Sequence, residues 1–409
     1  MGSEMCIRDR NWAEECQKFT PELSCVVVDG DAAHRAELAE SWPAADLVVT
    51  SYDLLRRDEA LYEGQEFYAC ILDEAQAIKN HTTQKYKAVC KVRSRVRFAL
   101  TGTPVENRLG ELWSIFSFLM PGYLPPYKSF CSRFEKPIVQ EEDQTAVRRL
   151  NQLTGPFILR RMKSDVLKEL PPKTENVYRI ELEEEQRKLY LAAVVDAREK
   201  LQAAKPEDKM AVFAVLMRLR EICCDPRLIA DNWEGGSAKL DACAELVSSA
   251  VEGGHRILLF SQFTSMLELL AKRLDAEGIS HFTLQGSTPK PVRAELVRRF
   301  NGGEVSVFLI SLRAGGTGLN LTAADIVIHY DPWWNVAAQN QATDRAYRIG
   351  QQNPVQVYKL IAQDTIEEKI VELQQAKQSL ADTVTGTADG AILSMRPDEL
   401  LQLLEGSEP

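Results

Sequence analysis

The stretch that decides the fold runs from Val307 to Gln351 and reads VFLISLRAGGTGLNLTAADIVIHYDPWWNVAAQNQATDRAYRIGQ. Its pattern predicts a buried strand, a glycine-rich turn, a second strand, a tryptophan pair and then a helix. In that helix Gln341, Arg345 and Arg348 are spaced by four and three residues, which would place them on one exposed face. Two guanidinium groups and an amide on one face suit a triphosphate, because each guanidinium can donate two hydrogen bonds to phosphate oxygens. A surface helix with ordinary arginines is the alternative.

The composition is that of an ordinary globular protein with two or three domains. The chain has 409 residues, of which 45% are hydrophobic and 26% are charged. No run approaches the roughly 20 apolar residues that a membrane-spanning helix needs, and no signal peptide opens the chain, so we expect no membrane partner. The nine cysteines show no paired spacing and there are only five histidines. These counts favour a reducing, cytoplasmic compartment and argue against a structural zinc site.

The net charge of −10 argues against nucleic-acid binding if it is taken alone. The charge is unevenly distributed, however: residues 85–97 carry six cations and no acid, and residues 148–173 carry seven cations and two acids. Basic patches on an acidic protein are compatible with binding to the DNA backbone. A solvated surface is the alternative for each patch.

Short apolar runs at the spacing of alternating strands and helices predict an α/β protein with parallel sheets. The expected strands are residues 25–28, 47–49, 70–72, 97–100, 256–260, 281–284, 305–310, 325–330 and 355–361. Polar clusters follow several of these strands, at the carboxyl ends where open parallel sheets bind ligands.

Two segments of the opening stretch resemble motifs V and VI of the Swi/Snf-type ATPases, which belong to helicase superfamily two. Residues 314–325 match the family pattern AGGxGLNLxxAD, and residues 331–351 closely resemble DPWWNPAxExQAxDRxxRIGQ, with Val336 in place of the usual proline and Gln339 at the pattern's glutamate. Near the start, NWAEECQKF at residues 11–19 resembles the family's NWxxExxKF helix. The resemblance extends over about residues 11–375. It implies an ATPase with two RecA-like lobes that translocates on double-stranded DNA.

The resemblance also implies a division of the chain into lobes. Residues 1–10 fit no pattern and are interpreted as a non-native start. The expected parts are a partial first lobe at residues 11–177 with a helical insertion at about 108–170, a helical segment and linker at 178–237, a second lobe (the helicase C-terminal domain) at 238–375, and a tail at 376–409.

The first lobe carries two motifs that resemble the family's nucleotide site. Asp73 and Glu74 follow an apolar strand, as in a Walker B motif, where Asp73 would hold Mg²⁺ and Glu74 would position the attacking water. The second motif, TGTP, couples nucleotide state to lobe movement in the family, and its candidate nucleotide-binding residues are Thr101, Gly102 and Thr103. Solvated loop carboxylates and a tight proline turn are the structural alternatives.

The second lobe would supply the remaining groups around ATP. Arg345 and Arg348 would act as arginine fingers, which contribute roughly 10³–10⁵ in rate, and Gln341 would orient the water or the γ-phosphate. A phosphate-facing turn would need the backbone freedom of glycine. The residues proposed for that turn are Gly315, Gly316, Gly318 and Asn320.

The resemblance places several residues at the DNA, where contacts to phosphate carry no sequence information. These are Thr50, Ser261, Gln262, Gln285, Gly286, Arg313 and Trp333. Binding should therefore be independent of DNA sequence and sensitive to salt. We expect one residue of the pair Trp333 and Trp334 to pack in the core. The protein is interpreted as a monomer of the bacterial cytoplasm, associated with the nucleoid, with RNA polymerase or DNA-bound proteins as candidate partners.

One family motif is missing. No glycine in the chain is followed by lysine, so the P-loop GxxxxGK[ST] is absent. In this fold the P-loop would stand before Asn11, so we interpret the chain as a truncated motor whose own ATPase activity is in doubt. Unpaired backbone and exposed apolar surface are then expected in the first lobe. Two alternatives remain open: an RNA-directed helicase of the same superfamily, and a DNA- or partner-binding scaffold that does not hydrolyse ATP.

Overall fold

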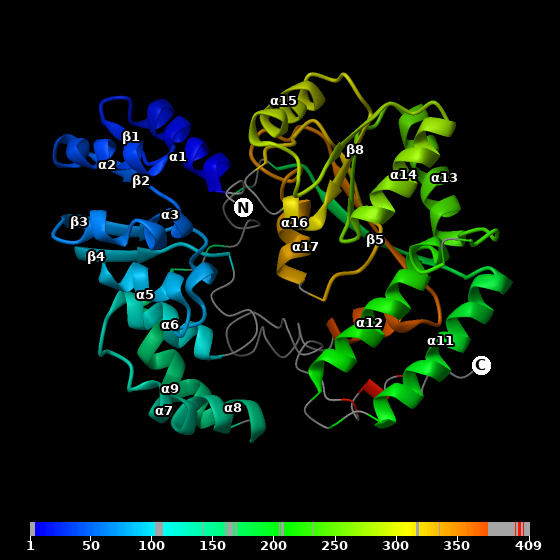
Figure 1. Ribbon diagram of the computed structural model, residues 1–409, viewed down its shortest axis with the longest axis horizontal. Coiled ribbons are helices and arrows are strands. Elements are labelled where there is room, and N and C mark those ends of the chain that lie inside the picture. Colours follow the sequence, from blue (N-terminus) through cyan, green and yellow to red (C-terminus); the bar gives the residue numbers. More distant parts are fainter. Residues whose placement is uncertain are drawn as a thin grey trace. The chain divides into compact units, whose positions relative to one another are not determined.

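The computed structural model describes residues 5–102, 109–141, 143–159, 161, 167, 170–203, 205, 208–230, 232–315, 319–334, 336–374, 397, 400, 401 and 404. These residues form two compact units (Figure 1). Unit 1 holds the described residues before Leu167, and unit 2 holds those from Leu167 onward. None of the described helices is both long and apolar enough to span a membrane.

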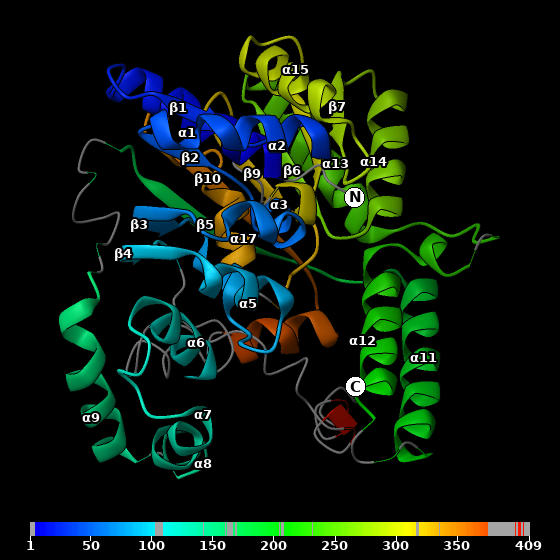
Figure 2. The same cartoon turned by 60° about the vertical axis from the view of Figure 1, so that its left-hand side comes forward.

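The first part of unit 1 alternates short parallel strands with helices, as the sequence pattern predicts (Figure 2). Its elements are α1 (Met5–Phe19), β1 (Cys25–Val27), α2 (Ala32–Ser41), η1 (Trp42–Ala44), β2 (Leu47–Val49), α3 (Tyr52–Arg57), α4 (Glu59–Tyr62), β3 (Glu66–Leu72), η2 (Ala75–Ile78), α5 (Gln84–Lys91) and β4 (Arg93–Ala99). Among the described residues, β1 pairs only with β2 and β3 only with β4. Unit 1 therefore contains two separate two-stranded sheets.

The β3–β4 sheet leaves large apolar side chains in solvent. Tyr68 is 75% exposed and Phe98 is 50% exposed, and Ile71, Val96 and Leu100 are exposed beside them. Monomeric proteins rarely leave so many large apolar groups together on one sheet. Exposed apolar surface was expected in this lobe, and these side chains of the β3–β4 sheet form such a surface.

The second part of unit 1 is helical. It contains α6 (Leu109–Leu119), α7 (Tyr127–Phe130), η3 (Cys131–Glu135), α8 (Lys136–Gln140), α9 (Gln144–Thr154) and η4 (Gly155–Phe157). These helices bury a core of their own that includes Leu112, Phe116, Phe130 and Leu150. The aromatic run after Leu109 is explained by this core.

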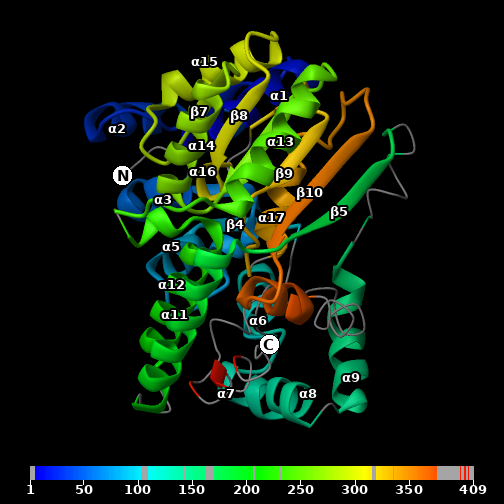
Figure 3. The same ribbon diagram turned by 90° about the vertical axis from the view of Figure 1, so that its right-hand side faces the viewer.

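Unit 2 is built on a parallel sheet of six strands in the order β5-β10-β9-β6-β8-β7 (Figure 3). The strands are β5 (Lys173–Ile180), β6 (Ile257–Ser261), β7 (His281–Leu284), β8 (Val307–Ser311), β9 (Ile326–His329) and β10 (Val355–Ala362). The central strands β6, β8 and β9 are buried along their whole length. Their near-continuous apolar sequences follow from this burial on both faces.

Helices cover the sheet and extend below it. They are α11 (Glu184–Ala203), α12 (Lys209–Cys224), η5 (Pro226–Leu228), α13 (Ala238–Glu252), α14 (Thr264–Ala276), α15 (Lys290–Asn301), α16 (Leu312–Gly315) and α17 (Val336–Thr343). The helices α13 and α14 pack on one face of the sheet through a single apolar core. The long helices α11 and α12 pack against each other and share a second core with Trp334 and residues after β10.

Three features differ from the sequence prediction. Residues 173–177 were placed in the first lobe, but they belong to β5, which pairs with β10 over its full length in unit 2. The sheet of unit 2 consequently has six strands, where five were expected. Helix α1 begins at Met5, within the segment that was set aside as non-native.

Candidate nucleotide and DNA sites

The carboxylate pair of unit 1 lies where β3 ends. Asp73 and Glu74 directly follow Leu72, and both side chains are half-buried. Glu74 has φ 50° and ψ 54°, a left-handed conformation that costs a residue with a β-carbon about 1–2 kcal/mol. Such conformations persist where the surroundings enforce them, and they cluster at functional sites.

Asp73 is held by groups from three directions. The indole Nε1 of Trp12 donates to Asp73 Oδ2 at 3.0 Å, and the Glu74 amide donates to Asp73 Oδ1 at 2.9 Å. The Tyr52 hydroxyl donates to the Asp73 carbonyl oxygen at 2.8 Å. Helices α1 and α3 thus fix both the backbone and the carboxylate of Asp73. Neither Trp12 nor Tyr52 was predicted to act at this site.

The side chain of Gln76 connects the two nucleotide motifs of unit 1. Its Nε2 donates to the Glu74 carboxylate, and its Oε1 accepts a hydrogen bond of 2.9 Å from the Thr101 hydroxyl. The Ala75 amide also donates to the Leu100 carbonyl oxygen at 2.9 Å. Glu74 and Thr101 are therefore brought to the same edge of the β3–β4 sheet. Gly102 is exposed at this edge, and Thr103 lies outside the described residues.

The Asp73–Glu74 pair fits Mg²⁺ but supplies only part of a nucleotide site. Carboxylate oxygens are the hard ligands that Mg²⁺ prefers, and this ion usually keeps several waters and takes one or two protein carboxylates. Within the described ranges, no three His, Cys, Asp or Glu side chains gather as a metal-binding group. The lysine and glycine amides of a P-loop, which hold the β- and γ-phosphates, are not present in this sequence.

The candidate arginine fingers of unit 2 do not share a helical face with Gln341. Helix α17 ends at Thr343, and the amides of Arg345 and Ala346 donate to the carbonyls of Ala342 and Thr343 in tight turns. The prediction of one helix through Arg348 is therefore wrong. At this end of the helix, the Thr343 hydroxyl donates to the Gln339 carbonyl oxygen at 3.3 Å and lies 2.9 Å from His329 Nε2.

The burial of the two arginines also differs from the prediction of an exposed face. Arg345 is only 9% exposed, whereas Arg348 and Gln341 are half-buried. Arg348 is thus the more accessible of the two guanidinium groups.

Backbone and amide contacts join the arginine segment to the glycine-rich turn. The Leu321 amide donates to the Arg345 carbonyl oxygen at 3.0 Å. The buried side chain of Gln351 donates to the carbonyl oxygens of Thr322, Ala324 and Ala346 at 3.2, 2.7 and 3.2 Å. Gln351 therefore holds both segments together, a role that its place at the end of RIGQ did not reveal.

The glycine-rich turn itself is only partly described. Gly315 ends α16 and Asn320 is exposed, with its carbonyl oxygen accepting from Asn301 Nδ2 at 2.8 Å. Gly316 and Gly318 lie outside the described residues, as does the side chain of Arg313.

Two candidate DNA-facing loops of unit 2 are fixed by buried charged residues. Ser261 is buried, and its hydroxyl donates to Asp331 Oδ1 at 2.6 Å. The loop at Gln285 and Gly286 is held by Arg293, which donates to both of their carbonyl oxygens at 3.1 and 2.8 Å. The sequence did not point to Asp331 or Arg293, because each acts through the loop that it holds.

The other candidate DNA contacts are placed as follows. Thr50 follows β2, and its hydroxyl is buried without a hydrogen-bond partner among the described residues. Trp334 is buried in the α11–α12 core, which confirms that one of the two tryptophans packs inside. Trp333 is half-buried against the same core, with its ring centroid 4.9 Å from that of Trp334. Contact of these residues with DNA stays a prediction.

His329 and Asp331 are among the buried groups of unit 2 whose pKa values are shifted. Burial lowers the pKa of His329 from 6.5 to about 3, which keeps its imidazole neutral. Burial raises the pKa of the Asp331 carboxyl, whereas the Arg220 guanidinium and the Ser261 hydroxyl oppose that rise.

A carboxylate pair at a strand end in one parallel-sheet unit, and an arginine-bearing segment after a strand in the other, are typical of two-lobed ATPases of helicase superfamily two. Comparisons with known proteins give the family. The profile of the SNF2-related domain matches residues 7–228, and that of the helicase conserved C-terminal domain matches residues 238–350. The chain belongs to the SNF2 family.

Curated relatives and a solved structure agree with this assignment. An uncharacterized ATP-dependent helicase of Mycoplasma pneumoniae is 39% identical over 400 residues, which cover 97% of this chain and 38% of the relative. A Bacillus subtilis protein named as an ATP-dependent helicase/translocase is 39% identical over 403 residues, covering 96% of this chain and 44% of that protein. The Sulfolobus solfataricus SWI2/SNF2 ATPase core domain is 35% identical, with a TM-score of 0.50, and the match covers 97% of this chain and 82% of that one. The chain thus spans less than half the length of these two curated relatives.

Proposed function

We propose that this chain forms the core of a DNA-dependent ATPase that translocates along double-stranded DNA. The observation that carries the proposal is the contact of Gln76 with both Glu74 and Thr101, which joins the Walker B carboxylates to the TGTP turn. Membership of the SNF2 family supports the use of ATP and movement on duplex DNA.

Each half of the proposed site has its own task. Glu74, held by Gln76 in a strained turn, orients the attacking water. Asp73, whose carboxylate accepts a hydrogen bond from Trp12, would hold Mg²⁺, and the ion would offset negative charge on the phosphates. In unit 2, Arg348 and Arg345 stabilise charge on the transferring phosphoryl group, and Gln341 helps to orient it. Closing and opening of the two units around ATP would shift the grip on DNA.

Contact with DNA in this proposal is electrostatic and independent of sequence. The basic segments at residues 85–97 and 148–173 offset the net charge of −10 locally. The protein would act as a monomer in the bacterial cytoplasm at the nucleoid, and two of its relatives are bacterial. RNA polymerase and DNA-bound proteins are the proposed partners.

The proposal is tested on a fusion, because the sequence contains no GxxxxGK[ST] motif. A strand and P-loop segment that carries this motif is fused to the N-terminus of the chain to give the P-loop fusion, and ATP hydrolysis is measured with and without duplex DNA. We expect duplex DNA to stimulate hydrolysis and duplex RNA not to do so. Stimulation by RNA alone would favour an RNA-directed helicase. DNA binding without any hydrolysis would favour a scaffold.

A further inference from the structure

Strand β5 leaves one side of the six-stranded sheet of unit 2 open. It stands first in the order β5-β10-β9-β6-β8-β7 and pairs with β10 along all eight of its residues, without a bulge (Figure 3). All of its residues except Ile180 are exposed. No strand in the described part of the chain pairs with its other side. An open edge of this kind is a template for pairing with a further strand.

Alternate residues of β5 direct their backbone hydrogen-bonding groups away from the sheet. The Val355 amide donates to the Pro172 carbonyl oxygen at 3.0 Å, and the Gln363 amide donates to that of Ile180 at 2.8 Å. Because these directions alternate along a strand, the even-numbered residues face β10 and the odd-numbered ones face the open side. The residues of β5 with N–H and C=O groups on the open side are therefore Lys173, Glu175, Val177 and Arg179.

The charged side chains of this edge lie partly in solvent. Glu175 contacts Lys173 at 2.7 Å and Lys359 at 2.8 Å, and its side chain is 36% exposed. Arg179 Nε donates to Glu368 at 2.9 Å, and its side chain is 56% exposed. Acidic and basic groups thus alternate along one face of the strand, where a neighbouring strand can reach them.

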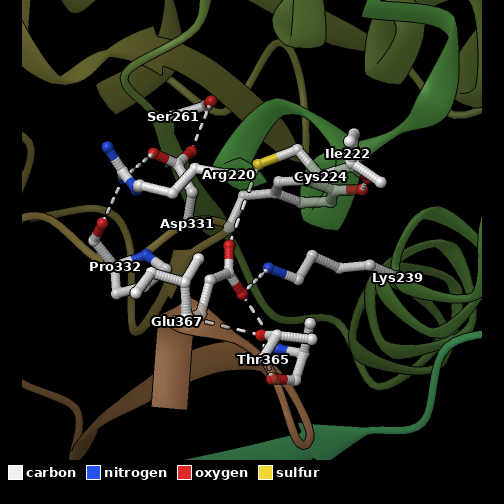
Figure 4. A network of polar contacts seen from close by, with 12 residues as sticks. Arg220, Ile222, Cys224, Lys239, Ser261, Asp331, Pro332, Thr365 and Glu367 are labelled. Carbon is white, nitrogen blue, oxygen red and sulfur yellow. Dashed lines mark hydrogen bonds and ion pairs between the residues drawn. The ribbon is translucent and has the colours of Figure 1, made fainter. Parts of the chain in front are cut away.

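Unit 2 also contains ion pairs that are closed to any partner. Figure 4 shows two of them: Arg220 Nη2 lies 3.4 Å from Asp331 Oδ2, and Lys239 Nζ donates to the Glu367 carboxylate. All four of these side chains are fully buried. The charges of β5 differ from these pairs because water, and therefore a second chain, has access to them.

The order of charges makes the open edge complementary to itself. In an antiparallel pair of two β5 strands centred on Val177, Glu175 of one copy lies opposite Arg179 of the other, and Lys173 lies opposite Glu181. The residues of β5 in these pairs are those with backbone groups on the open side, so the strands can exchange N–H···O bonds. A shift by two residues would bring Lys173 opposite Arg179 or Glu175 opposite Glu181, and like charges in such positions are destabilising. Charge therefore selects the register centred on Val177.

We propose that the open edge of β5 binds a second copy of this chain, with Val177 on the two-fold axis. Both copies use the same edge, so the pairing closes at a dimer. The proposal goes beyond the proposed function, in which one copy acts, and does not depend on it, because association requires neither ATP nor DNA. One strand pair is a small interface, so we expect a reversible dimer with a Kd of roughly 10–100 μM.

The first test measures the association of the full chain by sedimentation velocity at up to about 300 μM, without nucleotide or DNA. Arg179→Glu places two glutamates opposite each other on both sides of the axis, so the Kd of the dimer should rise roughly tenfold or more. The matched control is Arg298→Glu in α15, where an exposed arginine also contacts a glutamate. Its Kd should stay within about twofold of that of the unmodified chain, and thermal unfolding confirms that both variants are folded.

A cross-link tests the register. The Cα atoms of a hydrogen-bonded pair in antiparallel strands lie about 5.5 Å apart, a distance that a disulfide can span. Val177→Cys should therefore give a disulfide-linked dimer with oxidised glutathione as the oxidant. Thr174→Cys is the control, because position 174 lies opposite Ile180 of the second copy and its two thiols are too far apart to join. The unmodified chain, with nine cysteines of its own, gives the background.

Four results would overturn the inference. A chain that stays monomeric up to about 300 μM lacks the proposed pairing. Equal weakening by Arg179→Glu and Arg298→Glu would show that only net charge matters. A dimer that Arg179→Glu leaves unchanged uses another surface, such as the exposed face of the β3–β4 sheet. Weakening by Arg179→Glu without a cross-link at position 177 would contradict the register. The proposed function would stand in each case, because none of these results concerns ATP hydrolysis.

Discussion

Unit 2 should lose stability at mildly acidic pH, because His329 takes up a proton in the unfolded chain but not in the folded one. The imidazole is buried between β9 and α17, where its ring stacks on Phe260 at a centroid distance of 5.6 Å and its Nε2 contacts the Thr343 hydroxyl. Burial first, and then the charge of Lys359, lower the His329 pKa to about 3, and the charge of Glu175 opposes this. The folded protein therefore holds a neutral imidazole throughout the ordinary range of pH.

The sign and size of the effect follow from proton binding. Below its ordinary pKa of 6.5, His329 is protonated in the unfolded chain but not in the folded one, so stability is lost as pH falls from 6.5 towards 3. A pH of about 5 lies about 1.5 units below the ordinary pKa of His329. Proton binding to the unfolded chain over this interval lowers the free energy of unfolding by about 2 kcal/mol. The loss is fully expressed only below the folded-state pKa.

The assay compares the unmodified chain with His329→Gln, in which an amide can still donate to Thr343 but cannot titrate. Urea unfolding of unit 2 is followed by hydrogen exchange of the peptide that contains β9, at about pH 7.5 and about pH 5. The stability advantage of the unmodified chain over the variant should shrink by about 2 kcal/mol at the lower pH. An advantage that stays constant between the two pH values would show that the His329 pKa is not lowered in the folded protein.

Three further predictions concern other parts of the chain. Gln76→Leu removes the amide beside Glu74, so kcat of the P-loop fusion should fall roughly tenfold while its affinity for DNA is unchanged; an unaltered kcat would count against the link. Tyr68→Thr with Phe98→Thr should reduce self-association in light scattering and change unfolding by no more than about 0.5 kcal/mol; undiminished self-association would show that this apolar face is not responsible. Arg293→Met removes a fully buried guanidinium and leaves the partly buried carbonyl oxygens of the Gln285 loop without their donor, so urea unfolding should show a loss of about 2–4 kcal/mol; a loss below about 1 kcal/mol would contradict the assigned contacts.

The central strands of unit 2 were predicted well because the fold buries them on both faces. The central strands β6, β8 and β9 read as continuous apolar runs for this reason. Strand β5 was missed because it is an edge strand with mostly exposed, polar side chains, and its order comes from pairing with β10. Long-range pairing of this kind leaves no periodic signal in a single sequence.

The residues of the candidate site were also only partly predicted from the sequence. Motif spacing identified Asp73 and Glu74, and the structure places them at a strand end as expected. Motif spacing could not identify Trp12, which lies 61 residues from its partner Asp73 in the sequence. Nor could it identify Arg220, which lies 111 residues from its partner Asp331. These groups have no motif of their own, since their roles exist only in the folded units.

The prediction that α17 continues through Arg348 was wrong. The spacing of Gln341, Arg345 and Arg348 suited a helix, but helical spacing is equally compatible with a helix that stops between them. The Thr343 hydroxyl bonds to His329 and to a carbonyl of its own helix, and the chain turns there.

In the proposed function, carboxylates of unit 1 and arginines of unit 2 serve one ATPase reaction. The most direct test measures DNA-stimulated ATP hydrolysis by the P-loop fusion carrying either Glu74→Gln or Arg348→Ala. Each variant should lower kcat by about 10² or more while its Kd for duplex DNA stays within about twofold of the unmodified fusion. Hydrolysis at the unmodified rate by either variant would contradict the account.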